Sequence, residues 1–506
     1  MMEVHRGGIP STPAQDGRLV PEVRAAAGVR VSKAVSRSDL VLGSVLALVV
    51  LAFGRVYAGF VQDDAYITYR YARNIASGAG FVYNEGEYVL GTSTPLYALT
   101  LALLGTLTRR PVPEIGIAVG LVSLWAAGVA IYGLGKDRAG PAPAAASLVF
   151  LTNPFLRHMI GMETFFLLAI FLLATWAFVR ERLAIASILL GALVLVRYEM
   201  LFYPIFLALV GLLRTRRSPV WLWPSVPMVV AWVTYAALRF GSPIPLSASA
   251  KVISDRVPFA VGFLFYDLAF VKEVAWWGFH AILLTIGVVA MLVRKDAPRA
   301  YGLLVLWGVL YFVLVSPIAG SFPWYYGPLL PGIAVGTAWG AASLSAIRWG
   351  TTRGDGGGSK PRQGPFLLVS AGLLLANLAF WVRDWSSYRG GAFDHRLEAF
   401  RQASTWLLDH SASGATLAAS EIGYVGYFTN MRILDLYGLV TPGVHRWLAQ
   451  GLDFTTARAI EAYSPDYFLV QTSIAPMDLD VLNKDYSVAA VLDARYLIYE
   501  RTTGSK

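Results

Sequence analysis

Long apolar runs separated by short polar loops fill the chain from Leu40 to residue 382. A helix needs about 20 such residues to cross the hydrocarbon core of a bilayer, and the pattern predicts about eleven of these spans. The sequence therefore predicts an α-helical polytopic membrane protein. The predicted spans are 40–60, 112–135, 143–158, 162–179, 183–199, 200–213, 220–238, 274–293, 301–316, 324–347 and 365–382.

Basic loops set the predicted orientation, because cytoplasmic loops are enriched in Lys and Arg. The loops concerned are 180–182, 214–217, 294–299 and 348–363. Placing all four inside puts the N-terminus in the cytoplasm and everything after residue 382 outside. The apolar stretch 95–107 is short for a span, so we interpret it as an interfacial or re-entrant helix.

The two ends of the chain differ from this middle part. Residues 1–39 are polar and basic, lack a signal-peptide pattern, and are predicted to form a flexible cytoplasmic tail. From residue 383 the charge rises and the apolar runs shorten. The segment 393–410 has helical spacing, and the short apolar runs ATLAAS, RILDLY, DYFLVQ and YLIYE read as strands. Residues 383–506 are therefore predicted to form an extracytoplasmic α/β domain that binds or positions an acceptor.

Composition agrees with the membrane class and excludes several functions. Of 506 residues, 56% are hydrophobic and 15% are charged, whereas soluble domains carry about 25% charged residues. The net charge of +10 lies largely in loops beside the spans, so it gives no reason to expect a nucleic acid partner. The absence of cysteine excludes disulfides, thiolate catalysis and cysteine metal sites.

The predicted outer loop 61–111 begins with an acidic doublet, Asp63 and Asp64. The residues after it have helical spacing, and Gly78 and Gly80 provide an end. One Asp suffices to cap a helix, and a second adjacent carboxylate repels the first. A carboxylate here can serve as general base toward a hydroxyl. The pair can also bind a divalent cation beside a phosphate, although the sequence predicts no definite metal site or cofactor.

The run from Asp63 to Leu99 resembles the first outer loop of the GT-C superfamily of membrane glycosyltransferases. It is most similar to mycobacterial terminal arabinofuranosyltransferases and to bacterial mannosyltransferase and lipid A aminoarabinose transferase proteins. Tyr198 stands where this group often has Pro, and Leu246–Ser247 where it often has Asn-Thr. Further similar motifs are GMET (161–164), LVRYE (195–199), GSPIPLSASAK (241–251), FPWYYGPLLP (322–331) and EIGYVGYFTNMRILDLYGLV (421–440).

The resemblance implies a sugar donor carried on a polyprenyl phosphate and a glycan, lipid or protein acceptor. Transfer takes place at the outer face of the bacterial plasma membrane, with inversion at the sugar. An outer-loop Asp acts as general base. The resemblance favours Asp63 for this role, with Asp64 as its orienting partner or as a metal ligand.

Other candidate residues lie near the predicted outer ends of the spans. Arg197 and Lys251 are equally well explained as phosphate-binding cations and as membrane anchors. Trp324 and Tyr325 form either an aromatic interface belt or a stacking wall for sugar or isoprenoid. The full set of candidate substrate-binding residues is Arg70, Glu163, Arg197, Glu199, Lys251, His280, Trp324 and Tyr325.

Two other classes of protein fit the same hydrophobic pattern. A transporter or flippase of lipid-linked sugars requires inverted repeats and ionisable groups near the middle of the membrane. The chain contains no repeat, and its acidic groups gather at one predicted face. A non-catalytic membrane scaffold predicts that Asp63 and Asp64 tolerate replacement by Asn.

Overall fold

The computed structural model describes residues 36–57, 59–137, 140–248, 250, 274–294, 296–319, 322–346, 364–389, 395–471, 482–493 and 495–502. Contacts divide the chain into two units, Met1–Val41 and Leu42–Lys506. In the first unit, the Ser36 N–H donates to the Asp39 carboxylate and the Asp39 N–H to the Ser36 hydroxyl, both at 3.1 Å. Most of the predicted tail lies outside the described residues, and the features below belong to the second unit.

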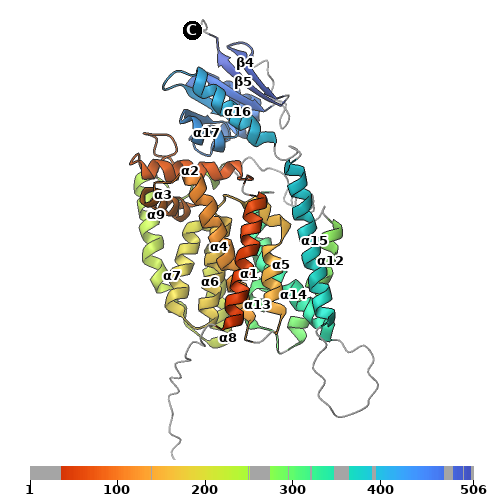
Figure 1. Cartoon of the computed structure of the whole chain (residues 1–506). Helices are drawn as coiled ribbons and strands as arrows, with labels where there is room; N and C mark the ends of the chain where they lie inside the picture. The colour runs from red at the N-terminus through yellow and green to blue at the C-terminus, as the bar shows by residue number, and fades with distance from the viewer. Residues whose placement is uncertain are drawn as a thin grey trace, which may run out of the picture. The chain divides into compact units, whose positions relative to one another are not determined.

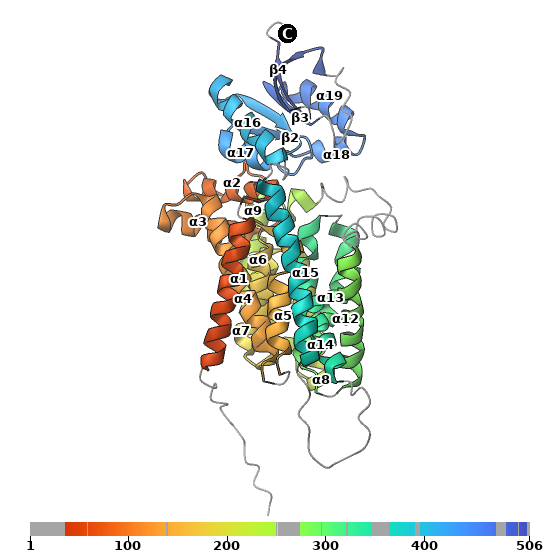
Figure 2. The ribbon, with the colours of Figure 1, turned by 45° about the vertical axis from the view of Figure 1, so that its right-hand side comes forward.

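Apolar helices lie side by side in a bundle (Figures 1 and 2). Helix α4 packs against α5 and α6, α6 packs against α7, and α14 packs against α5, α12 and α13. Their bounds, with the short 3-10 helices η1–η4, are α1 Arg37–Tyr57, α4 Val112–Gly135, α5 Ala142–Leu151, η1 Pro154–Met159, α6 Thr164–Val179, α7 Leu183–Val196, η2 Tyr198–Leu201, α8 Phe202–Thr215, η3 Pro219–Ser225, α9 Val226–Phe240, α12 Val274–Val293, α13 Arg299–Ala319, η4 Pro323–Leu329, α14 Leu330–Ala346 and α15 Gly364–Arg389.

The bundle has the surface of a membrane protein. In the described part of the chain, 5 helical segments are long and apolar enough to cross a membrane: Arg37–Tyr57, Val112–Gly135, Tyr198–Thr215, Pro219–Phe240 and Gly364–Ser387. Large apolar side chains remain exposed on them, such as Leu213 (79%) and Leu238 (84%), where a bilayer would cover them. The chain is therefore a multi-pass helical membrane protein. Shorter apolar helices cover most other predicted spans, so the number of crossings stays a prediction.

Several helix ends differ from the predicted spans. Helix α5 stops at Leu151, earlier than predicted, because Pro154 cannot continue it, and η1 follows. Helix α15 continues to Arg389, so the boundary predicted at residue 383 falls inside a helix.

Glycines allow a close helix contact between α12 and α14. A Cβ atom on Gly287 would lie 1.9 Å from the carbonyl oxygen of Gly336, and one on Gly340 would lie 1.9 Å from that of Leu283. Small residues let helix backbones approach closely in membranes, where no hydrophobic force drives helices together. This contact therefore fixes the spacing of the two helices.

Helix α2 (Asp63–Ala76) lies across the ends of the bundle helices (Figures 1 and 2) and contacts α3 (Pro95–Thr108), α4 and α17 (Gly423–Thr429). The predicted helix after the acidic doublet is confirmed. It ends where Gly78 adopts a φ of +86°, a left-handed conformation that favours glycine.

The C-terminal region contains a five-stranded sheet in the order β2-β1-β3-β5-β4. β1 runs parallel to β2 and β3, whereas β5 runs antiparallel to β3 and β4. Helices α16 and α17 share an apolar core with one face of the sheet, and α19 with the other. The bounds are α16 His395–His410, β1 Thr416–Ala419, β2 Arg432–Asp435, α18 Val444–Leu448, α19 Leu452–Tyr463, β3 Tyr467–Gln471, β4 Tyr486–Asp493 and β5 Tyr496–Arg501.

The four predicted strands correspond to β1, β2, β3 and β5, but β4 is an addition. It lies at the edge of the sheet, with Val488 48% exposed and Val491 68% exposed. Its register with β5 shifts between Val488 and Ala490 and again between Val491 and Asp493, so the strand lacks the regular alternation of apolar and polar residues that predicts a strand.

Candidate functional site

The acidic doublet forms the first turn of α2, where the positive end of the helix dipole favours negative charge. The two carboxylates have different surroundings. Asp63 accepts hydrogen bonds from the backbone N–H groups of Gly423 (2.9 Å) and Tyr424 (2.7 Å), at the start of α17. Both oxygens of Asp63 are thus engaged by the C-terminal region.

Burial raises the pKa of Asp63 to about 6, and the neighbouring charge of Asp64 acts in the same direction. The two N–H donors lower this pKa but do not offset the desolvation. Both Asp63 and Asp64 are partly exposed, but Asp64 makes no hydrogen bond or ion pair within the described residues. Of the two carboxylates, Asp64 is therefore the one whose oxygens are not engaged by backbone N–H groups.

The far end of α17 is held by arginines of α2. Arg70 is 2% exposed and donates to the carbonyl oxygens of Gly426 (2.8 Å) and Met431 (2.7 Å). It also donates to Tyr83 O at 2.8 Å and to Asn84 Oδ1 at 3.3 Å. One helical turn away, Arg73 donates to Tyr427 O and to Asn430 Oδ1. These contacts favour a structural role for Arg70 over the predicted substrate contact.

Helix α2 also contacts the turn that carries Glu163. The Tyr69 hydroxyl donates to Gly161 O at 2.8 Å, and the Gln62 N–H donates to Ile160 O at 3.3 Å. Gly161 has a φ of +81°, and a Cβ there would lie 2.6 Å from the Val61 side chain. The GMET turn therefore requires glycine at this position to fit against α2.

Four predicted residues form one buried cluster. Arg197 lies 3.3 Å from Glu163 and 2.6 Å from Glu199, and its guanidinium lies 4.0 Å from the ring centroid of Tyr325. The cluster exists because the chain breaks between α7 and η2: Arg197 is extended, with φ −154° and ψ 128°. The carboxylates of Glu163 and Glu199 neutralise the positive charge of Arg197, so this arginine has little charge left to attract a phosphate.

The other candidates are Trp324, His280 and Lys251. Trp324 is stacked on Phe322, with ring centroids 5.0 Å apart. His280 lies in α12 and is 1% exposed. Lys251 lies outside the described residues. Within the described ranges, no three His, Asp or Glu side chains converge as metal ligands.

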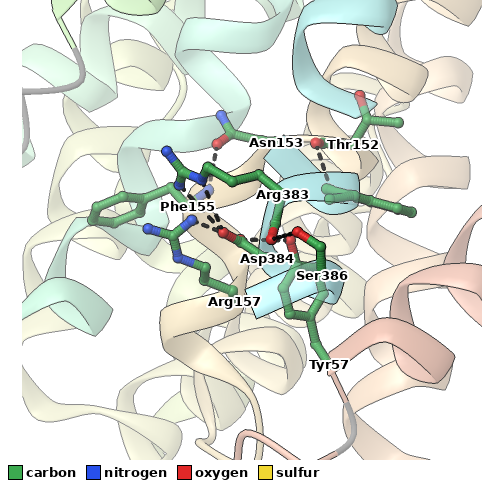
Figure 3. Close-up of polar contacts among 9 residues, drawn as sticks. Tyr57, Thr152, Asn153, Phe155, Arg157, Arg383, Asp384 and Ser386 are labelled. Atoms are coloured by element: carbon green, nitrogen blue, oxygen red, sulfur yellow. Dashed lines mark hydrogen bonds and ion pairs between the residues drawn. The ribbon is translucent and has the colours of Figure 1, made fainter. Parts of the chain in front are cut away.

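The sequence reasoning missed a second polar cluster, in which Asp384 lies between Tyr57 and Arg157 (Figure 3). Asp384 Oδ2 accepts from the Tyr57 hydroxyl (2.9 Å) and from Arg157 (2.7 Å), and Oδ1 lies 3.2 Å from Arg383. In the sequence, the available sign of this cluster was Asp384 itself, an acidic residue beside Arg383 just beyond the predicted span 365–382. This cluster joins α1, η1 and α15.

Comparison with solved structures identifies the fold. ArnT from Cupriavidus metallidurans, a GT-C glycosyltransferase, matches in its apo state with a TM-score of 0.60 and 15% identity, over 91% of this chain and 97% of ArnT. The same enzyme bound to undecaprenyl phosphate matches with a TM-score of 0.56 and 13% identity, over 92% and 98%. The chain therefore has a GT-C-like membrane fold, which confirms the predicted resemblance.

Other comparisons are more limited. The arabinofuranosyltransferase AftD from Mycobacteria matches with a TM-score of 0.48 and 15% identity, over 93% of this chain and 42% of AftD. A family model described as Domain of unknown function (DUF8728) matches residues 387–504. No curated protein sequence matches the chain.

Proposed function

We propose that the protein is a glycosyltransferase that moves a sugar from a polyprenyl-phosphate donor to a hydroxyl group of an acceptor. The GT-C-like fold supports this class, and the likeness to ArnT bound to undecaprenyl phosphate supports a lipid-linked donor. The bundle then crosses the bacterial plasma membrane about eleven times, with α2 and residues 383–506 on the outer side.

The observation that carries the proposal is the accessible carboxylate of Asp64 beside the anchored carboxylate of Asp63. A general base must be able to accept a proton from the acceptor hydroxyl. Asp63 has both oxygens engaged by N–H groups of α17, so protonating it weakens those contacts. We therefore assign the base to Asp64 and the positioning role to Asp63, the reverse of the order that the family resemblance favours.

In the proposed step, the acceptor oxygen forms a bond to the anomeric carbon as the bond from that carbon to the phosphate oxygen breaks. The hydroxyl proton passes to Asp64, and the polyprenyl phosphate leaves with the bonding electrons. Attack opposite the leaving group inverts the anomeric configuration. The phosphate needs a cation as its charge develops, and Lys251 remains the predicted one.

The buried cluster around Arg197 serves the sugar in this proposal. Since Glu163 and Glu199 already surround the guanidinium, Arg197 acts as a positioning residue for Glu163 and Tyr325. Glu163 then accepts hydrogen bonds from sugar hydroxyl groups, and Tyr325 provides an aromatic face. His280 and Trp324 are retained as predicted substrate contacts.

The test is transfer from radiolabelled polyprenyl-phosphate sugars by the purified full chain in nanodiscs. We expect Asp64→Asn to reduce kcat by about 100-fold to 10,000-fold, the usual contribution of a general base, with the fold intact. Asp63→Asn should weaken the contact with α17 and lower thermal stability as well as activity. Asp296→Asn, which alters an exposed ion pair with Arg294, is the matched control.

Other outcomes lead to different conclusions. Full activity in Asp64→Asn together with loss in a well-folded Asp63→Asn would return the base to Asp63. Equal turnover in all variants would contradict a catalytic doublet. Absence of transfer by the wild type from every donor in the panel would contradict the proposed activity.

A further inference from the structure

Four aromatic rings form a continuous group directly beside the acidic doublet. The ring of Tyr66, on α2, lies 5.0 Å from that of Tyr424, 5.8 Å from that of Tyr427 and 5.7 Å from that of Phe428. Tyr424 and Phe428 are one helical turn apart on α17, with centroids 4.4 Å apart. We name these four residues the aromatic platform.

The aromatic platform has a buried base and an open surface. Tyr66 is 6% and Tyr427 is 8% exposed, whereas Phe428 is 42% exposed and Tyr424 is partly exposed. Its position relative to the doublet is fixed by the backbone, because the Tyr424 N–H donates to Asp63. The exposed rings therefore belong to the helix whose first turn contacts Asp63.

Polar side chains of α16 border the aromatic platform. Helix α16 packs against α17, and its Glu398 accepts from Arg401 at 2.6 and 2.9 Å and from Gln402 at 3.0 Å. All three residues are exposed or nearly so. The surface thus combines flat aromatic faces with hydrogen-bond donors and acceptors at its edge.

We propose that the aromatic platform is a carbohydrate-binding subsite that holds the acceptor glycan with one hydroxyl toward Asp64. Sugar rings have C–H faces that pack on aromatic rings and hydroxyl groups that require polar partners, and this surface offers both. The proposal rests on the proposed function and specifies its acceptor as a glycan.

A membrane-anchoring role for the same rings is less consistent with the contacts. Interfacial anchors combine Trp or Tyr with apolar neighbours that enter the lipid. Here the charges of Asp63, Glu398 and Arg401 lie close to the platform, and a lipid surface would desolvate them at a cost. The charge pattern therefore favours a polar ligand.

Binding can be measured without donor, so its result is independent of whether transfer occurs. The full chain in nanodiscs is titrated with mannotriose, arabinotriose and galactotriose, and binding is followed by saturation-transfer NMR. We expect Phe428→Ala and Tyr424→Ala each to raise the Kd of the bound trisaccharide about tenfold, as loss of an aromatic anchor does. Phe454→Ala, which removes another exposed aromatic ring (38% exposed, in α19), should leave the Kd unchanged.

Two results would overturn the subsite: no binding of any of the three trisaccharides to the wild type, or equal Kd values in the wild type and both platform variants. A second experiment uses the absence of cysteine from the chain. A Phe428→Cys variant carries a single fluorescent label, whose emission should resist quenching by brominated lipids. Strong quenching would place the ring in the bilayer and overturn the proposal in favour of an anchor.

If the trisaccharide binds and transfer is absent, the subsite stands and the proposed activity fails. If transfer occurs and acceptor KM is the same in Phe428→Ala as in the wild type, the activity stands and the subsite fails.

Discussion

Two carboxylates in this protein, those of Asp63 and Asp435, accept hydrogen bonds from backbone N–H groups. Asp435 is completely buried and accepts from the N–H groups of Tyr437 (2.8 Å), Leu439 and Val440 (3.0 Å). These contacts hold the turn that follows β2. Burial raises its pKa to about 6 despite these donors, as it does for Asp63.

The raised pKa of Asp435 predicts a pH-dependent stability. The folded state holds the proton more tightly than the unfolded chain, in which the pKa of Asp435 is 3.8. The contribution of this group to stability is therefore fully present below pH 3.8 and is lost as the pH rises through about 6. From well below pH 3.8 to well above pH 6, the stabilisation by this group falls by about 3 kcal/mol in total.

Hydrogen exchange of the β2 amides, corrected for intrinsic rates, measures this effect. Asp435→Asn should reduce the slope of stability against pH between pH 4 and pH 6, leaving the contribution of Asp63, which has the same sign. The exposed Asp409→Asn serves as control. An unchanged slope in Asp435→Asn would contradict the assignment.

At the scale of elements, side chains of α2 contact both ends of α17. A carboxylate lies at the N-terminus of α17 and guanidinium groups lie at its C-terminus, where each charge interacts favourably with the dipole of α17. The two arginines differ in burial, since Arg70 is 2% exposed and Arg73 is half-buried.

This difference predicts unequal effects of two matched substitutions. Arg70→Met leaves several buried carbonyl groups without donors and should lower the free energy of opening α17 by about 3 kcal/mol or more. Arg73→Met removes more accessible contacts and should cost about 1 kcal/mol. Hydrogen exchange of α17 amides in the full chain measures both changes in the free energy of opening. Equal changes in the two variants would argue against a larger role for the buried Arg70.

The sequence predicted the helices better than their ends. Apolar periodicity located the bundle helices and four strands, because burial and lipid contact both select apolar residues. It missed the stop before Pro154 and the edge strand β4. At the site, it selected Glu163, Arg197, Glu199 and Tyr325, which the structure brings together. The contact between Asp63 and Gly423 joins residues 360 positions apart, and no local pattern encodes such a pairing.

On the scale of the whole molecule, Asp384 links three parts of the chain near the acidic doublet. The residue is 5% exposed and receives donors from α1, η1 and its own helix. The end of α1, η1 and α15 thus meet at this one carboxylate, as Figure 3 shows.

Removing this carboxylate should destabilise the molecule as a unit. Asp384→Asn deprives Arg157 and Tyr57 of a shared charged acceptor, at a cost of about 3 kcal/mol for a buried pair. Thermal unfolding in nanodiscs should shift downward by several degrees, while Asp296→Asn has little effect because its ion pair is exposed. A shift as small as that of the control would contradict a structural role for the cluster.

The pairing of Asp63 with α17 has a consequence for biosynthesis. The ribosome must add 360 further residues after Asp63 before the first of its two N–H partners exists. Until then the acidic doublet lacks the segment that holds Asp63. A nascent or truncated chain therefore completes its first apolar helices long before the backbone donors of Asp63 exist.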